Sequence, residues 1–525
     1  MSSISVRGGA TTSAGRGPAS TGAMSGTMLT VTAIALALGT FMQVLDSTIA
    51  NVSIPTIAGN LGVSTSQGTW VVTSFAVANG VSVPLTGWLM QRYGVVKTFV
   101  GSVILFTAAS FLCGVSWNLE SLIAFRVLQG AVSGPMIPGS QALLLSIFPS
   151  EKRGTALGVW SMTTLVAPVC GPLLGGYISD NWSWPWIFFI NVPIGAVCAF
   201  LSWRNLSGRE TPTRKVPVDI MGLSLLVVWV GSLQVMLDTG KDADWFNSPA
   251  IILLACMAVI GFLAWLIWET TQKDPIVDLS LFRSRNFAIG TLAYSLSYAI
   301  FFGNNLLLPL WLQTQVGYIA TWAGLVAAPS GVVALLCTPL VTRFMGKVDT
   351  RLAATAAIVA FAISYFMRSR YTPDANFMAY VMPMLVQGFS MSVFFVALIT
   401  LTLAEIPPEK TPSAAGLSNF SRYTAGSFAA SITTTLWDNR ETLHQSRLAE
   451  NAPLPIMAGA MEKMQVFGLS SGQALASVTN TVVRQAYAMA SIDFFWASGW
   501  LMLLMIPLVW LTRRPRVVVA GGAGD

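Results

Sequence analysis

LDSTIANVSIP, Leu45 to Pro55, places the carboxylate of Asp46 inside an apolar run that otherwise holds no charge from Met28 to Pro55. A carboxylate at the centre of a membrane helix costs about 3 kcal/mol on insertion scales. Because an intramembrane acid usually marks a functional site, we interpret Asp46 as the first sign of proton coupling. The same pattern leaves open a structural acid that hydrogen-bonds a neighbouring helix.

The composition excludes a soluble globular protein. Of the 525 residues, 54% are hydrophobic and 10% are charged, and the mean hydropathy is +0.65. Soluble domains carry about 25% charged residues. Apolar runs of about 18 residues or more, each long enough to cross about 30 Å of hydrocarbon, recur along the whole chain. We therefore predict an all-α membrane protein with fourteen spans, at residues 28–50, 68–90, 98–117, 121–145, 154–178, 187–205, 217–237, 249–269, 287–313, 321–342, 352–368, 377–403, 412–436 and 492–511.

The 29 basic residues are distributed unevenly between the two sides of this predicted membrane protein. With a cytoplasmic N-terminus, twenty of them fall on inside segments. Seven fall on outside segments, namely Lys241, Arg368, Arg370, Arg440, Arg447, Lys463 and Arg484. By the positive-inside rule both termini face the cytoplasm, and the rule accounts for the net charge of +7 without nucleic acid.

The spans are grouped as six, two and six along the chain. This grouping predicts an N-terminal six-helix bundle at 28–205, an inserted helix pair with its linkers at 206–285, and a C-terminal six-helix bundle at 286–511. A faint repeat between GWLMQRYGVVK, Gly87 to Lys97, and PLVTRFMGKVDTR, Pro339 to Arg351, agrees with two related bundles. Repeated bundles that rock about a central site are a known transporter architecture.

The two ends of the chain and the longest segment between spans lie outside the predicted membrane region. Residues 1–27, rich in Ser, Gly, Thr and Ala, are predicted to form a disordered cytoplasmic tail, and 512–525 a second cytoplasmic tail. Residues 438–490 are the longest periplasmic segment, in which Ser470 and Gln473 can form a capping box ahead of an amphipathic helix. This segment is either a solvated loop with local helix or a docking surface for an external partner.

Several features argue against an enzyme, an ATP-driven pump and a metal or cofactor site. The chain holds no GxxxxGK[ST] loop, no catalytic Cys/His or Ser/His arrangement, and a single histidine, His444. Its five cysteines fall within apolar spans and lack metal-ligand spacing. A passive channel or an uptake carrier stays open as an alternative to an active exporter.

Asp46 lies on a small and polar face of its span. At 100° per residue, Gln43, Asp46 and Ser47 share that face, which is what a cavity-lining helix needs. Asp46 is predicted to lie roughly 6 to 9 Å from the outer end of its span, within reach of protons from outside. Arg126, in the fourth span, is a second charge without a partner in its own helix. If the two meet, relative motion of their spans would drive proton uptake and release, because a nearby guanidinium favours an ionised carboxyl group.

The fifth span combines small residues with prolines. Ala167, Gly171 and Gly175 recur at every fourth position and predict a ridge for close helix packing. Pro168 and Pro172 remove backbone donors and are predicted to bend the helix. The segment is interpreted either as simple packing or as a point at which a transporter flexes.

Aromatic and Met side chains of spans nine and twelve predict an adaptable wall for a hydrophobic substrate, or else ordinary core and lipid-facing residues. The candidate cavity residues are Gln43, Ser47, Phe301, Phe302, Trp311, Met391, Phe394 and Phe395. Arg422, with Asn419 on its face in the thirteenth span, is a further buried cation to which the sequence assigns no role.

Several segments carry a resemblance to a known family. They are FMQVLDSTIANVSIPTIAGNLG, SQGTWVVTSFAVANG, PLTGWLMQRYG, RVLQG, SMTTLVAPVCGPLLGGYISD, WIFFINVPIG, DPIVDLSLFRSRNF and GLSNFSRYTAGS. Over nearly its whole length the chain resembles the major facilitator superfamily, and within it the EmrB-type multidrug exporters of the fourteen-span drug:proton antiporter branch. The resemblance implies a major facilitator fold of two six-helix bundles plus two inserted helices, in a bacterial inner membrane.

The resemblance also implies roles for particular residues. Asp46 takes the proton-site role of the first span, and Arg126 that of the proton-relay arginine of the fourth. The antiporter motif of the fifth span and the gating loop after the second correspond to two sets, Pro168, Gly171, Pro172, Gly175 and Gly176, and Gly87, Arg92, Gly94 and Lys97. Gln91 stands where the loop motif of the family usually has Asp, so the resemblance does not extend to an Asp-dependent gating bond there.

The function that follows is proton-coupled efflux of hydrophobic or amphipathic compounds. The resemblance further implies a three-component pump with a periplasmic EmrA-like adaptor and an outer-membrane TolC-like channel, for which the segment 438–490 is a possible docking site. Export of an endogenous fatty acid, siderophore or other metabolite is the alternative that the residues leave open.

Overall fold

The computed structural model describes residues 24–149, 152–215, 217–273, 275–345, 348–451, 454–466 and 470–514. Within these ranges the regular elements are helices, and none of the described residues forms a strand. The prediction of an all-α protein is therefore confirmed. Most of the two predicted tails, 1–23 and 515–525, lies outside the described residues.

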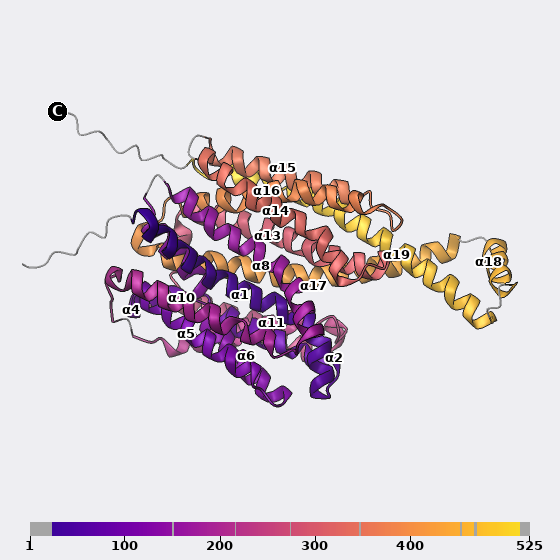
Figure 1. The fold of residues 1–525 in the computed structure, drawn as a ribbon, viewed down its shortest axis with the longest axis horizontal. Helices are drawn as coiled ribbons and strands as arrows, with labels where there is room; N and C mark the ends of the chain where they lie inside the picture. The colour runs from indigo at the N-terminus through magenta and orange to yellow at the C-terminus, as the bar shows by residue number, and fades with distance from the viewer. Residues whose placement is uncertain are drawn as a thin grey trace, which may run out of the picture.

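Helices of the first half of the chain pack into one bundle (Figure 1). Two interruptions have a simple cause, because Pro84 separates α3 from α4 and Pro135 separates α6 from α7, and proline lacks the N–H that a helix interior needs. The helix bounds are α1 Gly26–Leu61, α2 Thr65–Gly68, α3 Trp70–Ser82, α4 Thr86–Tyr93, α5 Val95–Gly114, α6 Leu119–Ser133, α7 Met136–Ile147, α8 Arg153–Asn181, α9 Trp186–Phe189 and α10 Asn191–Leu206.

Helices of the second half form a further packed group, and α11 and α12 connect the two (Figure 1). α11 packs against α12, α3 and α17, so the inserted pair touches both halves of the molecule. The bounds are α11 Ile220–Thr239, α12 Pro249–Thr271, α13 Arg285–Trp311, α14 Ala320–Met345, α15 Thr350–Arg368, α16 Phe377–Leu403, α17 Thr411–Asn451, α18 Leu454–Val466, α19 Ser471–Leu503 and α20 Ile506–Trp510.

Ten helical stretches among the described residues are long and apolar enough to cross a membrane. In the places of the other four predicted spans stand α3 with α4, α6 with α7, α8, and α17. A multi-pass membrane protein is therefore confirmed, whereas the length and composition of the helices do not confirm the count of fourteen.

Two helices continue past the ends of the predicted spans. α1 runs to Leu61, although its candidate membrane span, Gly26–Asn51, ends next to the predicted residue 50, so about 22 Å of helix follows Asp46 in all. α17 continues to Asn451, and α19 begins at Ser471, with the predicted capping box of Ser470 and Gln473 in place.

Residues 438–490 are therefore largely helical rather than a loop. They comprise the end of α17, all of α18 and the start of α19, and we call them the α17–α19 hairpin. In Figure 1 this hairpin extends beyond the other helices, with α18 farthest from them. Continuous helix satisfies the backbone hydrogen bonds of a segment that leaves the packed bundle, which a long extended loop would have to satisfy with water.

Candidate functional site

Asp46 and Arg126 form an ion pair in the first bundle. Nη1 of Arg126 in α6 lies 2.6 Å from Oδ2 of Asp46 in α1, and both side chains are fully buried. The structure thus brings together two charges that lie 80 positions apart in the chain. A buried pair of this kind is stable only while the two charges stay close together, because burying either charge alone costs several kcal/mol of desolvation free energy.

Two amide side chains complete the environment of the carboxylate. Nε2 of Gln129 donates to Asp46 Oδ1 at 3.0 Å, and Nδ2 of Asn191, the first residue of α10, donates to the same oxygen at 2.8 Å. Asn191 Nδ2 also lies 3.0 Å from Oγ of Ser110 in α5. All the hydrogen-bond partners of the carboxylate are donors, so the site as folded fits an ionised Asp46.

Arg126 is anchored independently of the acid. Its Nε donates to the carbonyl oxygen of Val71 in α3 at 2.9 Å, and its Nη1 also donates to Oε1 of Gln129 at 2.7 Å. The guanidinium carbon lies 4.3 Å from the ring centroid of Phe75, a cation–π contact. Arg126 is thus held mainly by α3 and α6, while the acid belongs to α1, so motion of α1 relative to α6 would separate the charges.

Gln129 and Asn191 are the members of the site that the sequence analysis did not single out. Both are uncharged, and amides in apolar runs are far less conspicuous than charges. A usable signal existed for Gln129, because it lies three residues after Arg126 and therefore on the same face of α6. Asn191 follows an unusually apolar run, WIFFI, which was the available sign that its amide needs a buried partner.

The small-residue ridge of α8 lies against α1 next to the ion pair. A Cβ at Gly171 would overlap the side chain of Thr48, and one at Gly175 would come within 2.9 Å of the Ile49 carbonyl oxygen. The structure thus packs the small-residue ridge of α8 against α1, the helix that carries Asp46. α8 continues as one helix from Arg153 to Asn181 through both prolines.

The remaining residues of the antiporter motif have different surroundings. Pro168 is exposed, the side chain of Pro172 lies outside what the structure describes, and a Cβ at Gly176 would meet nothing within 4 Å. Only part of the motif is therefore in the contact with α1.

The candidate cavity residues are mostly packed rather than open. Gln43 is buried, and the Ser47 hydroxyl donates to the Val44 carbonyl oxygen of its own helix. In the second bundle Phe301, Trp311, Met391, Phe394 and Phe395 are buried in hydrophobic clusters, whereas Phe302 is exposed. The rings touch one another, as in the edge-on contact of Phe301 with Phe395 at 6.0 Å.

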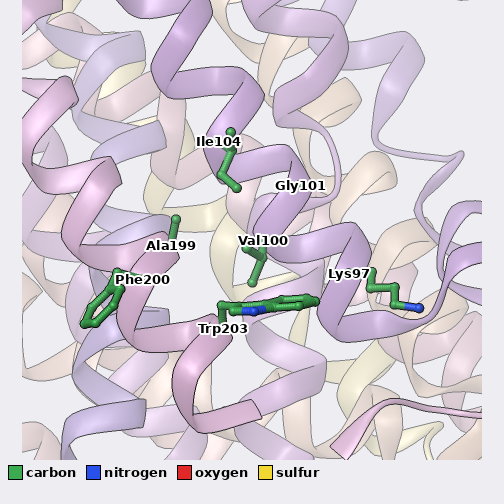
Figure 2. A pocket seen from close by; sticks show the side chains of 7 residues that line it. All are labelled: Lys97, Val100, Gly101, Ile104, Ala199, Phe200 and Trp203. Carbon is green, nitrogen blue, oxygen red and sulfur yellow. The ribbon is translucent and has the colours of Figure 1, made fainter. Parts of the chain in front are cut away.

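A pocket of about 420 Å³ lies elsewhere, between α5 and α10 (Figure 2). It is lined by Lys97, Val100, Gly101, Ile104, Ala199, Phe200 and Trp203. Of the predicted functional residues only Lys97 takes part, and Ile104, Phe200 and Trp203 are largely exposed. Its exposed apolar lining is what a helix surface facing lipid presents, and no predicted cavity residue contributes to it.

A carboxylate that the sequence analysis missed caps the start of α5, the helix that follows α4. Gly94 has φ +92°, a conformation that glycine adopts readily, and α5 begins directly after it. Glu210, from the linker before α11, accepts hydrogen bonds from the backbone N–H groups of Val96 at 3.0 Å and Lys97 at 2.9 Å. An acid at the first turn of a helix neutralises its unpaired N–H groups. Because Glu210 lies in a linker more than a hundred residues away, no local pattern predicted it.

Contacts between the two halves gather near Gly87 and Arg422. A Cβ at Gly87 in α4 would overlap Ser413 in α17. Nη2 of Arg422 donates to Oδ1 of Asn419 at 2.9 Å, and Nδ2 of Asn419 donates to Oε1 of Gln141 in α7 at 3.0 Å. Arg422 therefore lies at the junction of the bundles, next to the rings of Tyr298, Tyr423 and Trp160.

Comparison with known proteins matches most of the chain to the family that its sequence resembles. A model of the Major Facilitator Superfamily matches residues 36–430. The multidrug export protein EmrB of Escherichia coli is 49% identical over 504 residues, which cover 95% of this chain and 98% of that protein. The fatty acid resistance protein FarB of Neisseria gonorrhoeae is 46% identical over 504 residues, which cover 95% of this chain and 99% of that protein.

The fold has solved counterparts. The structure of the proton:xylose symporter XylE matches with a TM-score of 0.60 at 14% identity, over 92% of this chain and 95% of that one. At this identity the likeness shows the fold alone. The predicted major facilitator fold, the similarity to EmrB-type exporters, and the assignment as a transporter rather than an enzyme are confirmed. The chain belongs to the major facilitator superfamily.

Proposed function

We propose that this protein is a proton-coupled antiporter that exports hydrophobic or amphipathic compounds, with Asp46 as the proton site. The observation that carries the proposal is the fully buried ion pair of Asp46 with Arg126. Charges inside a membrane bundle are costly, so those that are present usually serve a function. The relatives named as multidrug export proteins support the substrate class.

Proton binding at Asp46 would act on the structure through its partner. A neutral Asp46 no longer balances the charge of Arg126, and an uncompensated buried charge costs about 3–5 kcal/mol. The arrangement in which the two side chains meet would lose its advantage over one in which α1 and α6 have moved apart. Because the α8 ridge is packed on α1 at Thr48 and Ile49, α8 would follow that motion.

Such a motion of α1 and α8 would be transmitted by α8 to the contact between the two halves of the molecule. A Cβ at Gly158 in α8 would press on Thr338 and Thr342 of α14, so the N-terminal part of α8 lies directly against the second bundle. Alternating access requires contacts of this kind to open and close. The proposed cycle takes up a proton outside, releases substrate there, and returns the proton to the inside, with both termini in the cytoplasm of a bacterial inner membrane.

Asp46→Asn tests the proposal. The Asn amide keeps the size of the side chain but cannot carry the proton, so we expect the fold and substrate binding to persist and gradient-driven export to be lost in proteoliposomes with an imposed proton gradient. Asp493→Asn is the matched control, because Asp493 in α19 pairs with His444 away from this site. Full gradient-dependent export by Asp46→Asn would remove Asp46 from the mechanism, and downhill flux indifferent to the gradient in the wild type would indicate a passive channel or an uptake carrier.

A second candidate function is export of an endogenous fatty acid or another metabolite. It is favoured by the relative named a fatty acid resistance protein, which matches this chain over nearly its full length. A panel of lipophilic cations, neutral drugs and fatty acids, transported with and without a proton uncoupler, separates the two. Uncoupler-sensitive export confined to the acids would favour the metabolite exporter.

We also propose that the α17–α19 hairpin contacts an EmrA-like adaptor, which in turn connects to a TolC-like outer-membrane channel. The support is its helical extension past the other helices in Figure 1. Paired helices of this length present long side-chain ridges on which another helical protein can pack.

A further inference from the structure

A further buried guanidinium, besides those of Arg126 and Arg422, lies in the C-terminal half at a residue that the sequence analysis counted on an outside segment. Arg368 is the last residue of α15 and is fully buried. Its Nη2 donates to Oε1 of Gln387 in α16 and lies 3.5 Å from the Met384 sulfur. Its Nε and Nη1 have no hydrogen-bond partner among the described residues. The described residues provide no carboxylate within ion-pair distance of it.

The surroundings of Arg368 repeat those of the ion pair in the first half. In α6, VLQG at 127–130 contains Gln129, and in α16, LVQG at 385–388 contains Gln387. The glycine after each glutamine packs against a neighbouring helix, Gly130 on the Phe75 carbonyl of α3 and Gly388 on the Ser330 carbonyl of α14. The two segments are therefore equivalent positions of an internal structural repeat.

The repeat extends to the partner of each glutamine. Nε2 of Gln129 donates to Oδ1 of Asp46 in α1, and Nε2 of Gln387 donates to Oδ1 of Asn305 in α13 at 3.1 Å. Asn305 follows Asp46 by almost the same number of residues as Gln387 follows Gln129. The second half thus has an amide where the first half has the carboxylate, and a guanidinium is present in both.

This replacement leaves the charge of Arg368 unbalanced. The rings of Tyr365 and Phe495 lie 5.3 and 5.9 Å from its guanidinium carbon, and its position at a helix C-terminus is favourable for a cation. Neither gives Nε and Nη1 an acceptor, and a buried charge whose donors are unmet is strongly destabilising. An anion brought in from outside the chain would supply what Asp46 supplies to Arg126.

We propose that Arg368, with Gln387 and Asn305, is an anion subsite that takes the carboxylate of an amphipathic substrate. Asn305 is only half-buried, so the cluster reaches an accessible side through it. The Met391 sulfur lies 3.8 Å from Gln387 Nε2, and Phe301 is one turn from Asn305 on α13, so apolar side chains lie beside the charged group. Both are packed in this structure, and the hydrocarbon part of a substrate would enter by separating them. The proposal rests on the proposed export function and names a substrate class for it.

Binding to the purified full-length protein tests the subsite without reference to a proton gradient. The probes are dodecanoate as an amphipathic carboxylate, tetraphenylphosphonium as a lipophilic cation, and chloride as a small anion. For Arg368→Gln we expect dodecanoate affinity to fall on the order of tenfold to a hundredfold, the effect of losing a hydrogen bond to a charged group, with tetraphenylphosphonium affinity unchanged. Arg368→Lys should retain part of the dodecanoate affinity, because it keeps the charge.

Asn305→Asp and Asn305→Leu form a matched pair of equal size. Asp at this position gives Arg368 an internal carboxylate and should exclude dodecanoate, whereas Leu adds no charge and should weaken dodecanoate binding only in part, through loss of the Asn305 amide. If Arg368 serves packing alone, Arg368→Gln will weaken both organic probes and lower the melting temperature, and Asn305→Asp will leave dodecanoate binding intact. Either result overturns the proposal.

Further outcomes separate this inference from the function on which it rests. Chloride binding that depends on Arg368, together with dodecanoate binding that does not, overturns the substrate assignment in favour of a small resident anion. Wild-type protein that binds and exports tetraphenylphosphonium but never binds dodecanoate removes the anion subsite and keeps the exporter. Gradient-independent flux of both organic probes instead contradicts the proposed antiport.

Discussion

At the scale of single residues, Asp46 is defined by the donors around it. Its carboxylate accepts hydrogen bonds from three side chains, those of Arg126 and Gln129 in α6 and that of Asn191 in α10. A hydrogen bond to a charged group contributes about 1.5–3 kcal/mol when buried. The amides therefore help to hold the carboxylate in place beside Arg126, even though they carry no charge themselves.

Removing one amide donor should shift the pH dependence of transport. Asn191→Ala deletes a donor to the carboxylate of the proposed proton site, so the pH profile of exchange should differ from that of the wild type. The measurement is substrate-driven proton release from proteoliposomes across a pH series.

Ser110→Ala is the control for this shift. The Ser110 hydroxyl contacts Asn191 but not the acid, so the change should move the pH profile far less. An Asn191→Ala profile that coincides with the wild type would show that Asn191 holds α10 in place without tuning Asp46.

At the scale of elements, the contact of α8 with α1 links the acid to the rest of the molecule. The ridge at Gly171 and Gly175 leaves no room for a side chain against Thr48 and Ile49. Close approach of two helices gives strong dispersion contacts over a narrow surface, and without water between them these contacts dominate helix association in a membrane. The pair α1 and α8 should move as a unit.

Gly171→Ala should uncouple this pair. The added methyl group meets the Thr48 side chain, and such overpacking costs about 1–3 kcal/mol. We expect a lower melting temperature and a large loss of proton-driven export, measured on purified and reconstituted protein.

Gly176→Ala on the same helix is the matched control. A methyl group there meets nothing within 4 Å, so both stability and export should stay close to the wild type. Equal effects of the two substitutions would mean that helix propensity, rather than the α1–α8 contact, is responsible.

At the scale of the whole molecule, two bundles and an inserted helix pair carry a hairpin that extends past them. α18 is the element farthest from the packed helices in Figure 1, and its neighbour in the contact network is α19. Few contacts tie this region to the bundles, so its loss should leave the transport machinery in place.

Replacing residues 448–475 with a short Gly/Ser linker tests the role of the hairpin. We expect gradient-driven export in proteoliposomes to persist, because the ion pair and the junction of the bundles are untouched. Crosslinking to a periplasmic adaptor and resistance of intact cells should be lost. Undiminished crosslinking would return the hairpin to a solvated helical extension without a docking role.

The two charges of the site were recognisable from the sequence because charge in an apolar run is rare. Gln129 and Asn191 were not, since amides are tolerated in apolar helices and only their partners reveal them. The burial of Arg368 was not recognisable either, because it ends its helix and hydropathy does not report which face of a helix end is buried. The internal repeat was visible in the sequence where Gly87 to Lys97 matches a segment of the second half. A more informative part of the same repeat, around Gln129 and Gln387, became recognisable only through the equivalent contacts of these two residues.

The sequence by itself determined that this chain is a multi-pass helical membrane protein with an acid in its first span. These properties follow from local transfer free energies, which depend on each segment alone. The tertiary structure decided which buried groups meet: Asp46 with Arg126, Glu210 with the start of α5, and Arg368 with no carboxylate in the part of the chain that the structure describes. Those meetings depend on how helices from distant parts of the chain pack, and the periodicity of one helix carries no information about the face of another.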